Sequence, residues 1–111
     1  MKKLLVALLF VLPATAFAEC NQNTTDEVAM CLDKEVKQLK TKLNQVYAKA
    51  YKQTDAKKEL ENSQKKWLAY KEAQCGAFTT ADAGMGMGAI TADLSCQTML
   101  YSQRIDILKA Y

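Results

Sequence analysis

The sequence has 111 residues, half of them hydrophobic, with a formal net charge of +3 and no histidine. A chain of this length is sufficient for one small domain but not for two. Without histidine it lacks the commonest general base and the commonest metal ligand, which disfavours acid–base and metal-dependent enzymes.

The first eighteen residues have the pattern of an export signal. Two lysines precede the apolar run Leu4–Leu12, which is too short for a membrane-spanning helix of about 20 apolar residues. Small residues ending at Ala18 form a cleavage signature. We therefore predict a signal peptide over residues 1–18, cleaved after Ala18, and a mature domain over residues 19–111.

Export would place the mature protein in the periplasm or the medium, where disulfides form and persist. In that compartment we expect no nucleic-acid partner, and no later segment of the sequence predicts a membrane span. Glu19 stands where a bacterial lipoprotein signal has a small residue, so we expect no lipid on the cysteine that follows. All four cysteines are predicted to be oxidised: Cys20, Cys31, Cys75 and Cys96.

The first helix is predicted to start at a capping box, in which Thr24 is followed three residues later by Glu27. Apolar residues then recur every three or four positions, the spacing of a helix with one apolar face. They are Val28, Leu32, Val36, Leu39, Leu43, Val46, Tyr47 and Ala50. Residues 33–71 hold eleven lysines and five acids, and we interpret this excess as a solvated helix surface.

A weak break at residues 53–55 precedes a second predicted helix over about Asp55–Cys75. Its inward side carries Ala56, Leu60, Trp67, Leu68 and Cys75. Gly76 is well placed to end this helix. Because the connection between the two helices is short, we expect them to form an antiparallel hairpin.

The segment Ala77–Ala89 is predicted to be a loop, since glycine and methionine alternate in it and Asp82 is its one charge. Its centre is a candidate binding loop: Gly84, Met85, Gly86, Met87 and Gly88. Loops on rigid scaffolds often carry function. Two thioethers suit monovalent copper, but without a histidine or a free thiol the site is incomplete. We therefore favour apolar packing of the methionines, with no cofactor and no metal.

Helical spacing returns in a third predicted helix, from about Thr91 to Ala110. The whole pattern predicts an all-α fold, a small three-helix bundle in which the antiparallel helical hairpin and the C-terminal helix are stapled by two disulfides.

The four cysteines allow three pairings, and the sequence does not choose among them. Alignment of the hairpin ends favours Cys31 with Cys75, which leaves Cys20 with Cys96. The pairing of Cys20 with Cys31 and of Cys75 with Cys96 stays open.

No catalytic site is predicted. Once the cysteines are paired no nucleophilic thiol is left, and the carboxylates lie mainly on lysine-rich helix faces, where ion pairing is their ordinary role. The sequence contains no phosphate-binding loop, nucleophile elbow or zinc spacing. We therefore expect a binding protein and not an enzyme.

Several residues form a specific pattern along the sequence: Leu43, Asn44 and Tyr47; then Gln64, Trp67, Leu68, Tyr70, Lys71 and Cys75; then Cys96, Arg104 and Leu108. This pattern resembles the LprI-like family of small exported lysozyme inhibitors. The resemblance extends from Cys20 to Leu108 and is most specific between Trp67 and Cys75. Lys71 stands where the family has arginine, which keeps the charge but loses the planar bidentate fork.

The resemblance implies an all-helical, disulfide-stapled exported domain that binds and inhibits lysozyme. Such hydrolases work with two carboxylates in a cleft, which an inhibitor could block sterically. The segment Ala77–Ser95, which contains the candidate binding loop, is the best insert, with Lys71 at its base as a source of charge. For Asn44, Gln64, Trp67 and Tyr70 we favour a buried polar-aromatic cluster over contact with a partner.

The alternative function is that of a non-inhibitory envelope-stress or structural protein. Its partner would be another envelope protein, peptidoglycan or copper.

Overall fold

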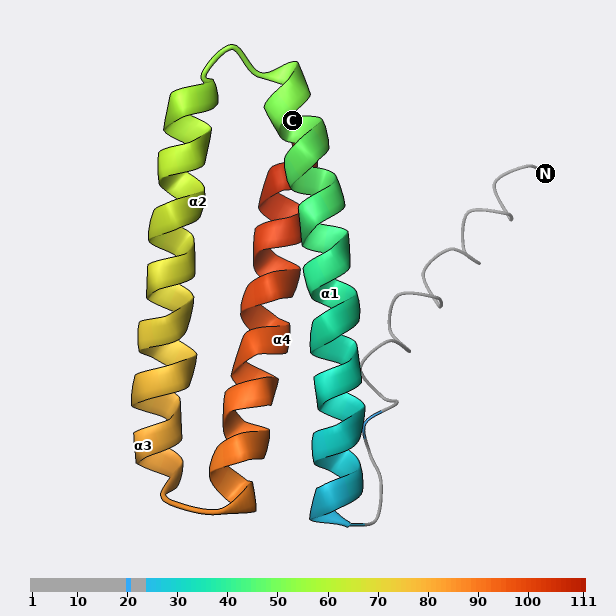
Figure 1. The fold of residues 1–111 in the computed structure, drawn as a ribbon, viewed down its shortest axis with the longest axis vertical. Coiled ribbons are helices and arrows are strands. Elements are labelled where there is room, and N and C mark those ends of the chain that lie inside the picture. Colours follow the sequence, from blue (N-terminus) through green and yellow to red (C-terminus); the bar gives the residue numbers. More distant parts are fainter. Residues whose placement is uncertain (1–19, 21–23) are drawn as a thin grey trace, which may run out of the picture.

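The computed structural model describes residue 20 and residues 24–111, so the predicted signal peptide and its cleavage site lie outside the described residues. Within these residues every regular element is helical, which confirms the all-α prediction (Figure 1). The elements are α1 (Thr25–Gln53), α2 (Lys57–Lys71), the π-helix η3 (Glu72–Thr79), α3 (Thr80–Ala83) and α4 (Met87–Lys109). Because α2, η3 and α3 follow one another without a break, the fold has the three helical rods that were predicted.

The first helix starts at the predicted capping box. The Thr24 hydroxyl oxygen accepts a hydrogen bond from the Glu27 N–H at 3.2 Å, which satisfies one of the free donors of the first turn. At the other end of α1 the Thr54 N–H donates to the Ala50 carbonyl at 3.0 Å. Local hydrogen bonds therefore define both ends of this helix.

The rods are arranged so that α4 lies between α1 and the continuous rod α2–η3–α3 (Figure 1). α1 packs mainly against α4, whereas η3 and α3 pack against the first half of α4. α1 and α2 run in opposite directions, as a hairpin should, but they make few direct contacts with each other. The predicted hairpin is therefore open, and α4 joins its two arms.

The hydrophobic core lies between α1 and α4. Its buried residues are Val36 and Leu43 from α1, and Tyr101, Ile105 and Leu108 from α4. From α2, Leu60 and Trp67 pack against this core from one side, and Lys71 is the one residue that α2 buries. Much of α2 therefore has no helix packed against it.

The predicted loop over Ala77–Ala89 is wrong. Helical structure continues through η3 and α3 as far as Ala83, and α4 already begins at Met87, four residues before the predicted start at Thr91. The connection between the two rods is only the short turn at residues 84–86.

The prediction that Gly76 ends the second helix is also wrong. A glycine can end a helix by taking a positive φ, and the glycine that does so is Gly84, with φ of 92°, at the end of α3. Gly86, with φ of 83°, immediately precedes α4. Gly76 lies within η3, where the Thr80 hydroxyl donates to the Cys75 carbonyl at 2.9 Å. The helix therefore ends eight residues later than the sequence indicated.

The disulfides connect Cys20 with Cys31 and Cys75 with Cys96, at Cα–Cα distances of 5.4 and 5.5 Å. The favoured pairing of Cys31 with Cys75 is wrong, because the element that packs against η3 is α4 and not α1. Each bridge is therefore more local than predicted, because one joins Cys20 to α1 and the other joins η3 to α4.

We expect Gly84→Ala and Gly86→Ala each to lower the free energy of unfolding by about 1–3 kcal/mol, since their backbone conformation is nearly exclusive to glycine. No atom lies within 4 Å of a methyl group added at either position, so the loss is conformational and not steric. Urea unfolding of the purified variants measures it.

Gly88→Ala is the matched control, because Gly88 lies in α4 without a positive φ and its added methyl also meets nothing within 4 Å. Alanine should be neutral there or stabilise the helix by up to about 1 kcal/mol. Similar losses for all three variants would contradict the described turn.

Candidate functional site

The turn between α3 and α4 forms the end of the molecule at which α1 starts (Figure 1). Met85 lies between the two positive-φ glycines and is 95% exposed, and two further apolar residues, Met87 and Ile90, are 37% and 50% exposed. We call these three residues the apolar tip. Asp82 is the one charged residue between Glu72 and Asp93, so the tip is apolar and contains no cationic group.

The tip is supported by the disulfide between Cys75 and Cys96, which connects η3 to α4. Cys75 is 1% exposed, so this bridge is part of the buried interior. The structure thus places the candidate binding loop, Gly84–Gly88, on a covalently fixed pair of helices, although it is a turn and a helix start instead of a long loop.

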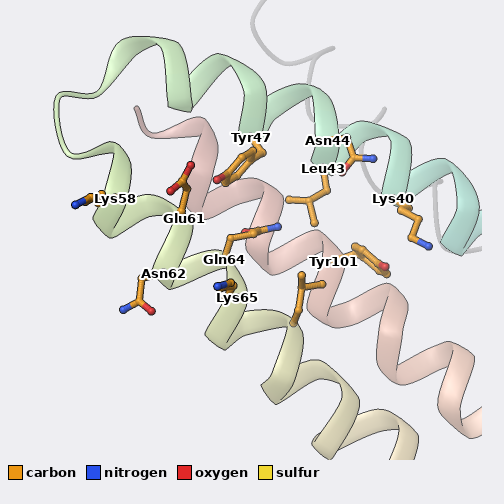
Figure 2. Close-up of a pocket in the computed structure, with 11 residues that line it drawn as sticks. Lys40, Leu43, Asn44, Tyr47, Lys58, Glu61, Asn62, Gln64, Lys65 and Tyr101 are labelled. Atoms are coloured by element: carbon orange, nitrogen blue, oxygen red, sulfur yellow. The ribbon is translucent and has the colours of Figure 1, made fainter.

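A groove of about 650 Å³ opens between α1 and α2 (Figure 2). It exists because α1 and α2 make few contacts with each other. Its lining comes from three helices: Lys40, Leu43, Asn44 and Tyr47 of α1; Lys58, Glu61, Asn62, Gln64, Lys65 and Leu68 of α2; and Tyr101 of α4. Tyr47 and Gln64 point into the space between the two helices (Figure 2).

Contacts between α1 and α2 close the groove near their connection. The Glu61 carboxylate raises the pKa of the Tyr51 phenol, because a nearby negative charge disfavours the phenolate. The Lys57 ammonium lies 5.2 Å from the centre of the Tyr51 ring. Polar contacts therefore bridge the two helices near their connection.

Beneath the groove lies Arg104, which is the single arginine of the sequence and is 7% exposed. Its Nε donates to Gln64 Oε1 at 2.9 Å and its Nη2 donates to Ser63 Oγ at 3.1 Å. Its guanidinium carbon lies 6.0 Å from the centre of the Trp67 ring. Both hydrogen-bond partners are neutral, and burial lowers the pKa of Arg104.

Lys71 is also buried, with 7% of its surface exposed. Its ammonium lies 5.4 Å from the centre of the Tyr101 ring and 3.3 Å from Glu72 Oε2. Tyr101 in turn meets Trp67 edge-on, with 5.5 Å between the ring centres. Lys71 and Arg104 therefore lie at the two ends of one aromatic pair, and Lys71 does not present its charge beside the turn.

The residues of the family pattern gather around the groove. Leu43, Asn44, Tyr47, Gln64 and Leu68 line it, and Trp67 and Arg104 lie beneath it with Gln64. The structure brings together Gln64 and Trp67 of the expected polar-aromatic cluster, but leaves Asn44 and Tyr70 exposed. Leu68, expected on the inward side, is 44% exposed.

The sequence pattern did not identify two residues of this region, Ser63 and Tyr101. The spacing of Tyr101 from Ile105 and Leu108, by four and seven positions, could have indicated its burial. No sequence signal marks Ser63, whose role depends on the approach of Arg104 from another helix.

Among residue 20 and residues 24–111, no group of three or more His, Cys, Asp or Glu side chains is arranged to hold a metal ion. In the same part of the sequence, none of the helices combines the length and the apolar character needed to cross a bilayer.

Comparison with known proteins gives one finding. The sequence profile of a family described as "Lysozyme inhibitor LprI" matches residues 18–108. None of the curated proteins and none of the solved structures compared with this protein matches it. The matched region includes all four cysteines, the groove and the apolar tip.

Proposed function

The chain belongs to the LprI lysozyme-inhibitor family, and from this membership we propose that it is an exported inhibitor of lysozyme-type glycan hydrolases, without catalytic activity of its own. The observation that carries the proposal is the family match over residues 18–108. Two disulfides in one small domain agree with export, because disulfides persist in oxidising compartments.

The proposed mechanism is steric occlusion of the substrate cleft. Lysozyme-type enzymes hold two carboxylates on either side of the scissile bond, inside a cleft that receives the glycan. An inhibitor that blocks such a cleft needs an element that can enter it, and the apolar tip is an exposed turn at one end of the molecule (Figure 1). The groove between α1 and α2 is concave and cannot enter a cleft, so we assign contact with the enzyme to the tip.

The tip offers no cation to the two carboxylates of the enzyme, and buried Lys71 cannot supply one. Binding should therefore depend on shape and apolar contact. Added salt weakens interactions between exposed charges, with a screening length of about 8 Å at 0.15 M ionic strength. A contact without charged groups should therefore be nearly insensitive to added salt. Exposed apolar surface of this sort is typical of protein-interaction sites.

The test is a turbidity assay of bacterial cell-wall lysis by lysozyme with the purified, oxidised protein. We expect inhibition by the wild type, and a loss of at least about 10-fold in inhibitory potency for Met85→Ser, equal to about 1.4 kcal/mol of binding free energy. Met99→Ser is the matched control, because Met99 is 61% exposed on α4 but lies about 18 Å along the helix from Met87.

The possible outcomes separate the function from the contact surface. Absence of inhibition by the wild type at micromolar excess would reject the proposed function. Inhibition that Met85→Ser and Met99→Ser leave equally intact would retain the function and reject the tip as the contact site.

A further inference from the structure

A second cavity, of about 250 Å³, lies where α1, α2 and α4 meet near the connection between α1 and α2. This is the opposite end of the molecule from the apolar tip (Figure 1). Its walls are largely apolar and include Leu60 and Leu108, while Ser63 and Arg104 provide polar groups and Glu59 and Tyr111 also border it.

Arg104 lines this cavity, and one edge of its guanidinium is not used by its hydrogen bonds to Gln64 and Ser63. A guanidinium has five N–H donors in a planar fork, and the Nε and Nη2 hydrogens on one edge are used by Gln64 and Ser63. The terminal edge, formed by Nη1 and the second Nη2 hydrogen, has no hydrogen-bond partner among the described residues. Carboxylates bind to guanidinium edges of this kind through two parallel hydrogen bonds.

The charge of Arg104 also lacks a counterion. No carboxylate of the described residues lies within 4.0 Å of the guanidinium; the ion pairs there are those of Lys37 with Asp33 and of Lys71 with Glu72. A buried cation is costly unless an anion compensates it, and the Trp67 face and two neutral acceptors compensate this one only in part. The terminal edge of the guanidinium is therefore able to bind an anion.

Size and charge narrow the class of ligand. The volume of about 250 Å³ is below the roughly 300–1,000 Å³ of pockets for drug-sized ligands, so the occupant is small. The apolar walls suit a short hydrocarbon body. The Glu59 carboxylate at the border disfavours a doubly charged anion such as phosphate, because like charges repel.

We propose that this cavity binds a single carboxylate carried on a small apolar body, with the terminal edge of Arg104 as its bidentate anchor. The carboxylate can belong to a small free acid or to the C-terminus of a peptide. The inference goes beyond lysozyme inhibition, because the apolar tip lies at the other end of the fold.

Trp67 provides a built-in probe, since it is the single tryptophan of the sequence and its ring lies 6.0 Å from the Arg104 guanidinium carbon. Titration with sodium butyrate at constant ionic strength should give a saturable change in Trp67 fluorescence, with half-saturation at about 1–10 mM. Butyramide, which has the same shape without the charge, should give none.

A second pair of probes distinguishes the sources of the carboxylate. Acetyl-Ala-Ala with a free C-terminus is compared with the same dipeptide amidated. Tighter binding of the free peptide than of butyrate identifies a peptide C-terminus as the preferred ligand, and the reverse order identifies a small free acid.

Three variants test the role of the anchor. Arg104→Lys keeps the charge but loses the fork, and should weaken butyrate binding at least about 10-fold. Glu59→Gln removes the repelling charge from an exposed position and should tighten butyrate binding about 2- to 3-fold. Lys109→Gln, which removes an exposed cation outside this cavity, should leave the affinity for butyrate unchanged.

The proposal is overturned if the wild type shows no saturable response to butyrate up to about 50 mM. It is also overturned if a folded Arg104→Lys protein binds butyrate as well as the wild type does. Should Arg104→Lys fail to fold, Glu59→Gln decides, and unchanged affinity in that variant counts against the site.

Discussion

Replacement of Tyr101 by alanine should lower the free energy of unfolding by about 3–5 kcal/mol, the usual loss for a buried aromatic residue. Tyr101 is 2% exposed and belongs to the core between α1 and α4. Its ring also meets Trp67 edge-on and lies 5.4 Å from the Lys71 ammonium. Its removal would leave a cavity where all three helical rods meet, and would uncover a buried cation.

Urea unfolding followed by circular dichroism measures this loss. Because small domains have about 5–15 kcal/mol of net stability, the Tyr101→Ala protein should be partly unfolded at 37 °C. Met99→Ala, two residues away but 61% exposed, should change the stability by less than about 0.5 kcal/mol. A loss below about 1 kcal/mol for Tyr101→Ala would contradict the described packing of α4.

Loss of the disulfide between Cys75 and Cys96 should have the next largest effect. In Cys75→Ala/Cys96→Ala the unfolded protein is freed from a loop of 21 residues, which corresponds to about 3 kcal/mol of lost stability. The bridge connects two packed elements, and Cys75 is fully buried, so the native structure gains little freedom in return. Thermal unfolding of the double variant, with no reductant present, measures the effect.

The bridge between Cys20 and Cys31 is the matched control for this prediction. It closes a shorter loop, with a sequence separation of 11, and fastens Cys20 to α1 without connecting two helices. Its removal frees Cys20 in the native state as well as in the unfolded state, so we expect a loss below about 2 kcal/mol. An equal or larger loss than for Cys75→Ala/Cys96→Ala would contradict this difference.

The elements that could be predicted from the sequence are those that depend on local chemistry. The capping box at Thr24 and the apolar spacing along α1 placed the first helix correctly, since both act within a few residues of each other. The same spacing predicted the C-terminal helix, although it missed the first turn. Apolar spacing and the breaks between helical segments predicted three helices, and the four cysteines predicted two disulfides.

Long-range packing explains what could not be predicted. The favoured cysteine pairing assumed that the hairpin closes on itself, but α4 packs along α1 and contacts η3. The groove of about 650 Å³ has the same origin, because an open hairpin leaves space between α1 and α2. Neither feature has a local sequence signal.

The burial of Lys71 and Arg104 could not be predicted from the sequence either. Lys71 interrupts the apolar spacing of its helix, which indicates an exposed residue, yet the aromatic pair of Trp67 and Tyr101 shields it. In the sequence, only the family resemblance marks Arg104. Its neutral partners, Gln64 and Ser63, come from a different helix some forty residues away, so their contact could not be inferred from spacing.

The proposed entry of the apolar tip into the lysozyme cleft is tested most directly by calorimetric binding to lysozyme with the cleft free and with the cleft filled by a saturating oligosaccharide inhibitor. We predict that the oligosaccharide abolishes binding of the wild type. Met85→Ser should weaken binding to the free enzyme at least about 10-fold, while Met99→Ser should not. Binding of unchanged affinity to lysozyme with a filled cleft would contradict entry of the tip into the cleft.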